Sequence, residues 1–314
     1  MSRCLYCYQE LGEGETDFHP QCGKKIFGSK TVPLLPYTKA DIKQLAEQVI
    51  RSQTTLTGVQ AKLSLDISSS PNQPQRFTIV GLWGRYILKP QTEQFKYMPE
   101  VEDLTMHLAE LAKVNVVPHS LIRFADGELA YITKRIDRTA KGEKLPMEDM
   151  CQLSERLTEY KYKGSYEKIS KIIMQYSAVP KLDVINFWEQ VVFSWLTGNA
   201  DMHLKNFSLI EDAPGSRKFS LSAAYDMLPV NIVLPEDNEE LALTLNGKKR
   251  NIHRKDFLAF AQNCEISPSA AEKMMNKLCN LENAFLAACE ASYLSGELKT
   301  KTSELISERI YRLK

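Results

Sequence analysis

Apolar positions recur along the chain in two rhythms, which divide it into a strand-rich first half and a helical second half. Side chains of a strand point alternately to two faces, so alternating apolar and polar residues predict strands. The strand-like segments of the first half are "TTLTGVQAKLSLDI", "RFTIVGLWGRYILKP", "SLIRF" and "LAYITKRI". Residues 39–53 and 100–114 instead repeat apolar positions at helical spacing, and we predict a helix over each.

From about residue 147 onward, helical spacing dominates. The segment "LDVINFWEQVVFSWLTG" predicts a strongly apolar helix that ends at Gly198. Two short strand candidates, "FSLIED" and "KFSLSAAYD", follow it and look like a hairpin. Further helices are expected around 254–264, 268–291 and 303–313.

This order of elements predicts an α+β fold with two lobes. We expect a Cys/His segment over residues 1–30, a β-rich N-lobe over 31–145 and an α-helical C-lobe over 146–314. The Gly- and Pro-containing stretch "GKKIFGSKTVPLLPY" is predicted to act as a linker after the first of these parts.

The composition is that of a globular protein, and the charge limits the kinds of partner that it can bind. The 314 residues are 43% hydrophobic and 25% charged, which is close to average and enough to fill two lobes. The net charge of +1 predicts no broad basic surface for nucleic acid. No apolar run approaches the 18 or so residues of a membrane span, and "MSRCLYCYQE" has no signal-peptide core. We therefore expect a cytoplasmic protein that does not bind a membrane.

Three of the seven cysteines lie in the first 22 residues, together with a histidine. Cys4 and Cys7 form C-x2-C, and His19 and Cys22 form H-x2-C eleven residues later. Two such half-sites supply the four ligands of a tetrahedral zinc ion, so one interpretation is a small structural zinc knuckle. The other is three buried thiols beside an unrelated histidine.

The stretch "LTGNADMHLKNFSLI" places polar groups at fixed offsets between two apolar runs. Asp201 and Asn206 form D-x4-N, the offset that protein kinases use for the acid that handles the substrate hydroxyl and for the amide that holds magnesium. His203 is interpreted as a residue that orients the loop rather than as a general base. Lys205 either steadies the transferred phosphoryl group or is an ordinary solvated lysine.

Three more residues occur in the order that a kinase requires. Asp226 ends an apolar run in "AAYDMLP", where a second metal-binding carboxylate is needed. Lys89 lies at the end of the strand-like "RYILKP", where a lysine can pair with nucleotide phosphates, and Glu102 in the following helix is a candidate ion-pair partner for it.

At these residues the chain resembles the HipA-type serine/threonine kinases, which are toxins of bacterial toxin–antitoxin modules. The resemblance covers most of the chain from about residue 50, and the segments that carry it are "TTLTGVQAKLSL", "GRYILKP", "PEVEDLTMHLAEL", "ITKRIDR", "LPMEDMCQL", "TGNADMHLKNFSL" and "AAYDMLP". It implies a bilobed protein-kinase-like fold that uses ATP and magnesium.

The resemblance also implies roles for individual residues. Asp201 would be the catalytic acid/base, Asn206 and Asp226 the magnesium ligands, and Lys89 the contact to the ATP phosphates. The segment "KRIDR" would supply the adenine hinge and a ribose contact through Arg135, Ile136 and Asp137. The segment "TLTGVQAK" matches the phosphate loop of the family and contributes Thr57, Gly58, Val59, Gln60 and Lys62.

Members of the family often carry an autophosphorylated serine in that loop, and Thr55 occupies the matching position here. Thr55 and Thr57 are therefore candidate phosphosites, because a phosphate there would compete with the ATP phosphates for the same backbone N–H groups. The alternative is that both threonines only cap turns.

The usual targets in the family are aminoacyl-tRNA synthetases, whose phosphorylation stops growth. The expected partners are such a synthetase and a small helix-turn-helix antitoxin, so that DNA is reached only through the antitoxin. Longer relatives carry an additional N-terminal β-rich subdomain, which some modules supply as a separate protein. Two other functions remain open for this sequence: a small-molecule phosphotransferase, and a catalytically silent kinase fold that acts as a binding module.

Overall fold

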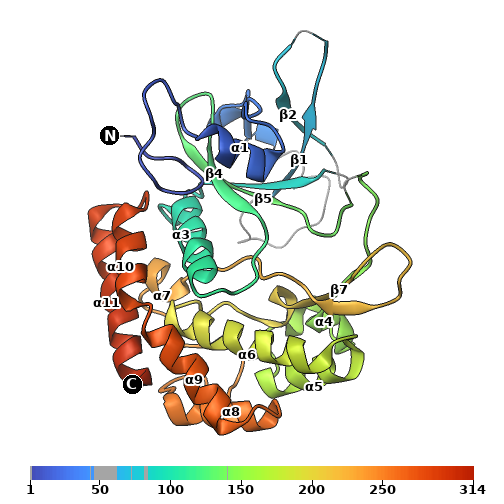
Figure 1. Cartoon of the computed structure of the whole chain (residues 1–314), viewed down its shortest axis with the longest axis vertical. Coiled ribbons are helices and arrows are strands. Elements are labelled where there is room, and N and C mark those ends of the chain that lie inside the picture. The colour runs from blue at the N-terminus through green and yellow to red at the C-terminus, as the bar shows by residue number, and fades with distance from the viewer. Residues whose placement is uncertain (1, 43, 46–61, 72, 81–83, 140) are drawn as a thin grey trace. The chain divides into compact units, whose positions relative to one another are not determined.

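A computed structural model describes residues 2–42, 44–45, 62–71, 73–80, 84–139 and 141–314 (Figure 1). The phosphate-loop residues Thr55, Thr57, Gly58, Val59 and Gln60 lie outside the described residues, as does most of the helix expected over 39–53. The chain forms two compact units. The first comprises Met1–Asp103, Val117–Gly142 and Ala291–Tyr293, and the second comprises Leu104–Val116, Glu143–Glu290 and Leu294–Lys314.

The first unit is built on an antiparallel sheet, and the strand-like segments of the sequence all contribute to it. Its five described strands lie in the order β2-β1-β3-β5-β4. Their bounds are β1 Leu63–Ser68, β2 Arg76–Ile79, β3 Tyr86–Pro90, β4 His119–Arg123 and β5 Leu129–Lys134. The β3–β5 register places Lys89 opposite Tyr131, so the candidate ATP lysine lies on a central strand.

One short helix and one long helix accompany this sheet. Helix α1, Pro20–Phe27, is only eight residues long and would be unstable alone. Its Phe27 packs edge-on against Phe77 and at a tilt against Tyr86, with ring centroids 5.5 and 6.0 Å apart. Helix α3, Met98–Leu111, begins in this unit and was expected from the helical spacing over 100–114.

The second unit consists mainly of helices, with a small sheet in the order β6-β7-β8. Strands β7 and β8 form the antiparallel hairpin that the sequence predicts. The strands are β6 Met147–Asp149, β7 Ser208–Glu211 and β8 Phe219–Leu221. The helices are α4 Met150–Leu153, α5 Tyr166–Tyr176, α6 Pro180–Leu196, α7 Val230–Val233, α8 Arg254–Asn263, α9 Pro268–Cys279, α10 Glu282–Ala291 and α11 Gly296–Leu313, with 3-10 turns at Thr158–Tyr160 and Leu204–Asn206.

Two helix predictions in the last third need correction. The single helix expected over 268–291 is two helices, because α9 ends at Cys279 with Asn280 as its cap and α10 begins at Glu282. Helix α11 begins at Gly296, seven residues before the expected start, because the side chain of Ser295 accepts a hydrogen bond from the Leu298 N–H and caps it.

Helix α6 is the most buried helix of the second unit and agrees with its prediction. Phe187, Trp188 and Trp195 on this helix are almost fully inaccessible to solvent. Such burial fixes the position of the helix end, from which the candidate catalytic loop departs. None of the described helices is both long enough and apolar enough to cross a membrane.

Candidate active site

The D-x4-N loop starts where α6 ends, and its first residues fix its direction. Gly198 has φ +78°, a left-handed conformation that favours glycine. A Cβ atom at this position would lie 2.6 Å from the Leu305 side chain, so no larger residue fits without rearrangement. The Asn199 N–H then bonds to the Ser194 carbonyl over 2.9 Å.

The Asp201 carboxylate, at the start of the loop, is oriented by a tyrosine from another part of the second unit. The Tyr162 hydroxyl donates to Asp201 Oδ1 over 2.6 Å. Burial, followed by the nearby negative charge of Asp201, raises the pKa of Tyr162, so its hydroxyl remains a donor at neutral pH. The Asp201 N–H also donates to the Asn199 side-chain oxygen over 3.3 Å.

Asn206 is tied to the same residue by its amide. Its Nδ2 donates to the Asp201 backbone carbonyl over 2.9 Å. An amide nitrogen only donates, so this bond identifies which end of the Asn206 amide is Nδ2. The other end is Oδ1, an oxygen ligand of the type that a magnesium ion prefers. Asn206 is buried on the 3-10 turn Leu204–Asn206. The structure thus brings the two predicted residues of the motif together.

His203, which lies between Asp201 and Asn206 in the sequence, is buried, and its contacts hold the loop in place. Its Nδ1 accepts a hydrogen bond from the Lys205 N–H over 3.2 Å, and its ring packs edge-on against Tyr162. Burial lowers the pKa of His203, and the opposing effect of Asp201 does not reverse this shift. A neutral His203 that accepts at Nδ1 agrees with the interpretation that it orients the loop.

Lys205 makes an ion pair that the sequence did not indicate. Its Nζ lies 2.7 Å from Asp149 Oδ2, and about a third of the lysine side chain is exposed. Asp149 also caps α4 through a reciprocal capping box with Gln152. The partly exposed lysine is therefore held at the end of β6 by an ion pair.

Asp226, the predicted second metal ligand, has φ +57°, an uncommon conformation for a residue other than glycine. Its neighbours fix the segment on both sides. The Ala224 N–H bonds to the Asn115 carbonyl over 2.7 Å. The Tyr225 hydroxyl bonds to Ser208 Oγ over 2.6 Å and donates to the Lys205 carbonyl over 3.0 Å, which connects this segment to the D-x4-N loop.

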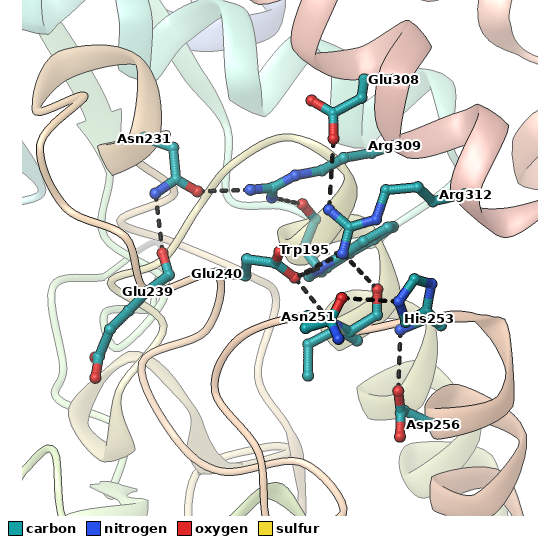
Figure 2. A network of polar contacts seen from close by, with 11 residues as sticks. Trp195, Asn231, Glu239, Glu240, Asn251, His253, Asp256, Glu308, Arg309 and Arg312 are labelled. Atoms are coloured by element: carbon teal, nitrogen blue, oxygen red, sulfur yellow. Dashed lines mark hydrogen bonds and ion pairs between the residues drawn. The ribbon is translucent and has the colours of Figure 1, made fainter.

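An arginine from α11 supports the loop at the end of α6 (Figure 2). Buried Arg309 donates to the Trp195 carbonyl and, over 2.7 Å, to Asn231 Oδ1. The Asn231 N–H in turn donates to the Gly198 carbonyl over 3.1 Å. Burial lowers the pKa of Arg309 to about 10, which still leaves it protonated at neutral pH. Nearby Arg312 pairs with Glu240 over 3.0 Å.

In the first unit, Lys89 and Glu102 form the ion pair that the sequence predicted. Lys89 Nζ lies 2.5 Å from Glu102 Oε1, and both side chains are almost completely buried. The Lys89 ammonium also lies 5.4 Å from the centre of the Tyr131 ring. Kinases use a lysine–glutamate pair of this kind to hold the lysine for nucleotide phosphates.

The candidate hinge residues also lie in the first unit. Asp137 accepts from Arg135 over 2.9 and 2.7 Å and from Arg138 over 2.7 Å. Burial opposes ionisation of Asp137, but the bonds from Arg135 and the charge of Arg138 lower its pKa. Lys62 is an exposed residue directly before β1.

The Cys/His segment gathers its four predicted ligands at one place in the first unit. The sulfur atoms of Cys4, Cys7 and Cys22 and one ring nitrogen of His19 all lie within 4.8 Å of one another. The eleven residues between the two half-sites therefore bring them together rather than leaving an unrelated histidine.

Sequence reasoning missed Tyr162, Asp149, Tyr225 and Arg309. A capping-box signal, Asp149 followed by Gln152 three residues later, was present in "LPMEDMCQL" and could have marked the start of α4. The other three act over long sequence separations, and no local pattern marks them.

A five-stranded sheet whose Lys89 pairs with Glu102 of α3, and a helical unit that carries a D-x4-N loop, define a kinase-like fold. Two solved structures agree with it. Shewanella oneidensis HipA, solved with HipB and operator DNA, superposes with a TM-score of 0.69 at 18% identity, over 96% of this chain and 79% of that one. The Helicobacter pylori proinflammatory kinase CtkA gives a TM-score of 0.55 at 15% identity, over 78% and 92%.

The family follows from the sequence comparison. Residues 54–285 match the model of the HipA-like C-terminal domain, and the chain belongs to this family. It is 26% identical to a "Putative kinase" of Haemophilus influenzae over 75% of this chain and 74% of that protein. It is 31% identical to "Putative kinase Y4dM" of Sinorhizobium fredii over 68% of this chain, but spans only 54% of that relative.

Proposed function

We propose that this protein is a serine/threonine protein kinase of the HipA type, which transfers the γ-phosphate of ATP to a protein hydroxyl. The observation that carries this proposal is the joined Asp201–Asn206 loop, in which the Asn206 amide donates to the Asp201 backbone carbonyl and the Tyr162 hydroxyl orients the Asp201 carboxylate. The buried Lys89–Glu102 pair supports it, because a lysine held in this way is the nucleotide-binding part of a kinase.

Each residue has a role in this reaction. Asp201 accepts the proton of the attacking hydroxyl, and Tyr162 holds its carboxylate in one orientation. Asn206 Oδ1 and the Asp226 carboxylate would hold magnesium, which supplies positive charge to the phosphates when it is bound with ATP. Lys89 would bind the phosphates, and Arg135, Ile136 and Asp137 would form the hinge.

Transition-state stabilisation is the proposed role of Lys205. A cation near the transferred group stabilises the charge that develops on it. The ion pair with Asp149 keeps Lys205 within the D-x4-N loop region and limits its conformational freedom. His203 positions the loop as a neutral side chain.

The finer proposals concern the targets and partners. Membership of the family supports an aminoacyl-tRNA synthetase as substrate and autophosphorylation at Thr55 or Thr57. The Shewanella neighbour was solved with its partner HipB and operator DNA, which supports a small DNA-binding antitoxin as partner here, and a separate protein resembling the N-terminal subdomain is a further candidate. We expect the protein to act in the cytoplasm.

The test is transfer of labelled phosphate by the purified full-length chain with magnesium and labelled ATP. Label should enter the chain itself or an added aminoacyl-tRNA synthetase, and Asp201→Asn and Asp226→Asn should each abolish labelling. Asp212→Asn is the matched control, because Asp212 is an exposed acid in the turn of the β7–β8 hairpin.

Two results would contradict the proposal. Label that enters an aminoglycoside but no protein would identify a small-molecule phosphotransferase. Nucleotide binding without any transfer to either class of acceptor would identify a silent binding module. Mass spectrometry of the peptide that contains Thr55 and Thr57 would locate the autophosphorylation.

A further inference from the structure

The cluster of Cys4, Cys7, His19 and Cys22 has the spacing and surroundings of a bound zinc ion. Cys7 Sγ lies 3.4 Å and Cys22 Sγ lies 3.8 Å from His19 Nδ1. Ligand atoms of one tetrahedral zinc are separated by about 3.5 to 3.8 Å, given Zn–S and Zn–N bonds of about 2.3 and 2.0 Å. The histidine thus already lies at ligand distance from two sulfur atoms.

The other ring nitrogen of His19 shows which tautomer is present. Its Nε2 lies 3.0 Å from the Glu10 carbonyl oxygen, which only accepts, so Nε2 carries the proton. Nδ1 therefore directs a lone pair at the sulfur atoms. Zinc-bound histidines usually donate their remote N–H to a carbonyl or carboxylate in this way.

The three cysteines of the cluster are all available as metal ligands. Cys4 and Cys22 are buried, and Cys4, Cys7 and Cys22 are free thiols rather than disulfides. Three thiols and one imidazole gathered at one place are a donor set that zinc selects.

The folded knuckle (residues 4–22) is connected directly to the sheet and to α3 within the first unit. The Leu121 N–H on β4 donates to the Leu5 carbonyl over 3.4 Å. Tyr8 directly follows the second cysteine, has φ +61°, and donates its hydroxyl to Asp103 Oδ2 over 2.7 Å in the buried interior. His119 Nδ1 lies 2.8 Å from the other oxygen of Asp103, so this carboxylate is held from two sides.

Asp103 is adjacent to Glu102, the partner of Lys89. We infer that the Cys4, Cys7, His19 and Cys22 cluster binds one zinc ion, and that the metal, through Tyr8 and Asp103, holds the first turns of α3 where Glu102 pairs with Lys89. The metal site stands on its own geometry. Its effect on nucleotide binding rests on the proposed function.

The metal itself is tested on the full-length chain as purified. We expect about one zinc per chain by elemental analysis, and an absorption band from cobalt–thiolate bonds after exchange with Co²⁺. Cys22→Ser should lower the zinc content at least fivefold, whereas Cys279→Ser, which removes a buried thiol outside the cluster, should leave it unchanged. Less than a tenth of a zinc per chain, or a disulfide among these cysteines, would overturn the metal site.

The connection to α3 is tested by Tyr8→Phe, which removes one hydroxyl and none of the ligands. This variant should keep one zinc per chain but raise the Kd for an ATP analogue about three- to tenfold, the range expected when one hydrogen bond to a charged group is lost. Tyr86→Phe is the control, since its hydroxyl donates to the Ile26 carbonyl of α1 in the same core.

These readouts separate the two proposals. Zinc content and the cobalt spectrum require no nucleotide, so they decide the metal site even if the chain proves not to be a kinase. An unchanged Kd in Tyr8→Phe, with zinc retained and nucleotide bound by the wild type, would overturn the connection while leaving the kinase proposal intact.

Discussion

The Tyr162 hydroxyl and the Asp201 carboxylate are joined by a 2.6 Å hydrogen bond between residues 39 positions apart. An acid that accepts a proton must face its substrate in one orientation. The donor on Oδ1 makes the two oxygen atoms of the Asp201 carboxylate inequivalent and so fixes the orientation of the carboxylate. This relationship places Tyr162 among the positioning residues of the proposed kinase.

Replacing Tyr162 by Phe should therefore lower kcat for phosphoryl transfer about tenfold while leaving the KM for ATP unchanged, because the lost bond orients only the acid. Steady-state kinetics with labelled ATP would show it. Tyr160→Phe is the control, because the Tyr160 ring lies beside the Lys163 ammonium. An unaltered kcat in Tyr162→Phe would show that the loop alone orients Asp201.

The buried Lys89–Glu102 pair predicts an asymmetric response to mutation. Glu102→Gln removes the negative charge that lies 2.5 Å from the buried Lys89 ammonium and should lower the free energy of unfolding by about 3 kcal/mol. Lys89→Met combined with Glu102→Leu should recover much of that stability but not nucleotide binding. Urea denaturation and calorimetry with an ATP analogue measure the two effects separately. Glu297→Gln, in an exposed pair with Lys301, is the control and should leave the free energy of unfolding nearly unchanged.

Gly198 and Gly215 allow backbone strain to be separated from steric conflict. Both have positive φ, but only at Gly198 would a Cβ meet another side chain, that of Leu305 at 2.6 Å. Gly215→Ala should lower the free energy of unfolding by about 1 kcal/mol, because alanine disfavours the left-handed conformation. Gly198→Ala should lower the free energy of unfolding by about 1 to 3 kcal/mol more, because the added methyl group overpacks against Leu305. Adding Leu305→Ala in a double variant should remove this additional loss. Equal losses at the two glycines in denaturant unfolding would contradict the proposed contact.

Glu100, in the first turn of α3, predicts a pH dependence of stability. Burial raises its pKa from 4.5 to about 7, and no partner within the described part of the chain bonds its Oε2. Ionising it therefore costs more in the folded than in the unfolded chain, so its contribution is favourable below about pH 4.5 and is lost as the pH rises through about 7. Glu100→Gln should raise Tm at pH 8 and leave it unchanged at pH 4.5. A parallel shift at both pH values would rule out titration of Glu100 as the cause.

Lys205 and Asp149 give a test of whether the lysine acts on the phosphoryl group. If Lys205 stabilises the transition state, Lys205→Met should lower kcat at least tenfold, whereas Asp149→Asn should have a smaller effect because the lysine is retained. Kinetics of both variants under identical conditions distinguish the roles. Equal losses would mean that the pair only holds the loop to β6.

The sequence predicted most strands and helices because alternation and helical spacing are local properties. The D-x4-N loop was predictable for the same reason: Asp201 and Asn206 are five residues apart, and their spacing is part of the motif. The Lys89–Glu102 pair required a further assumption about fold, which the structure supports.

Residues that act across the chain could not be predicted in this way. Arg309 contacts the Trp195 carbonyl from 114 positions away, and Tyr8 reaches Asp103 from 95 positions away. Their partners are a backbone carbonyl and a carboxylate, which have no sequence signature. The split between α9 and α10 was also missed, because apolar periodicity continues across Asn280 and only the capping geometry shows the break.

The position of Arg309, far downstream of the loop that it supports, has a consequence for synthesis of the protein. Chains grow from the N-terminus, so the loop with Asp201 is made more than 100 residues before the arginine that supports it. Until α11 has left the ribosome, Trp195 and Asn231 lack this contact. A nascent chain that has not yet included α11 would therefore contain every proposed catalytic side chain and still lack this supporting contact.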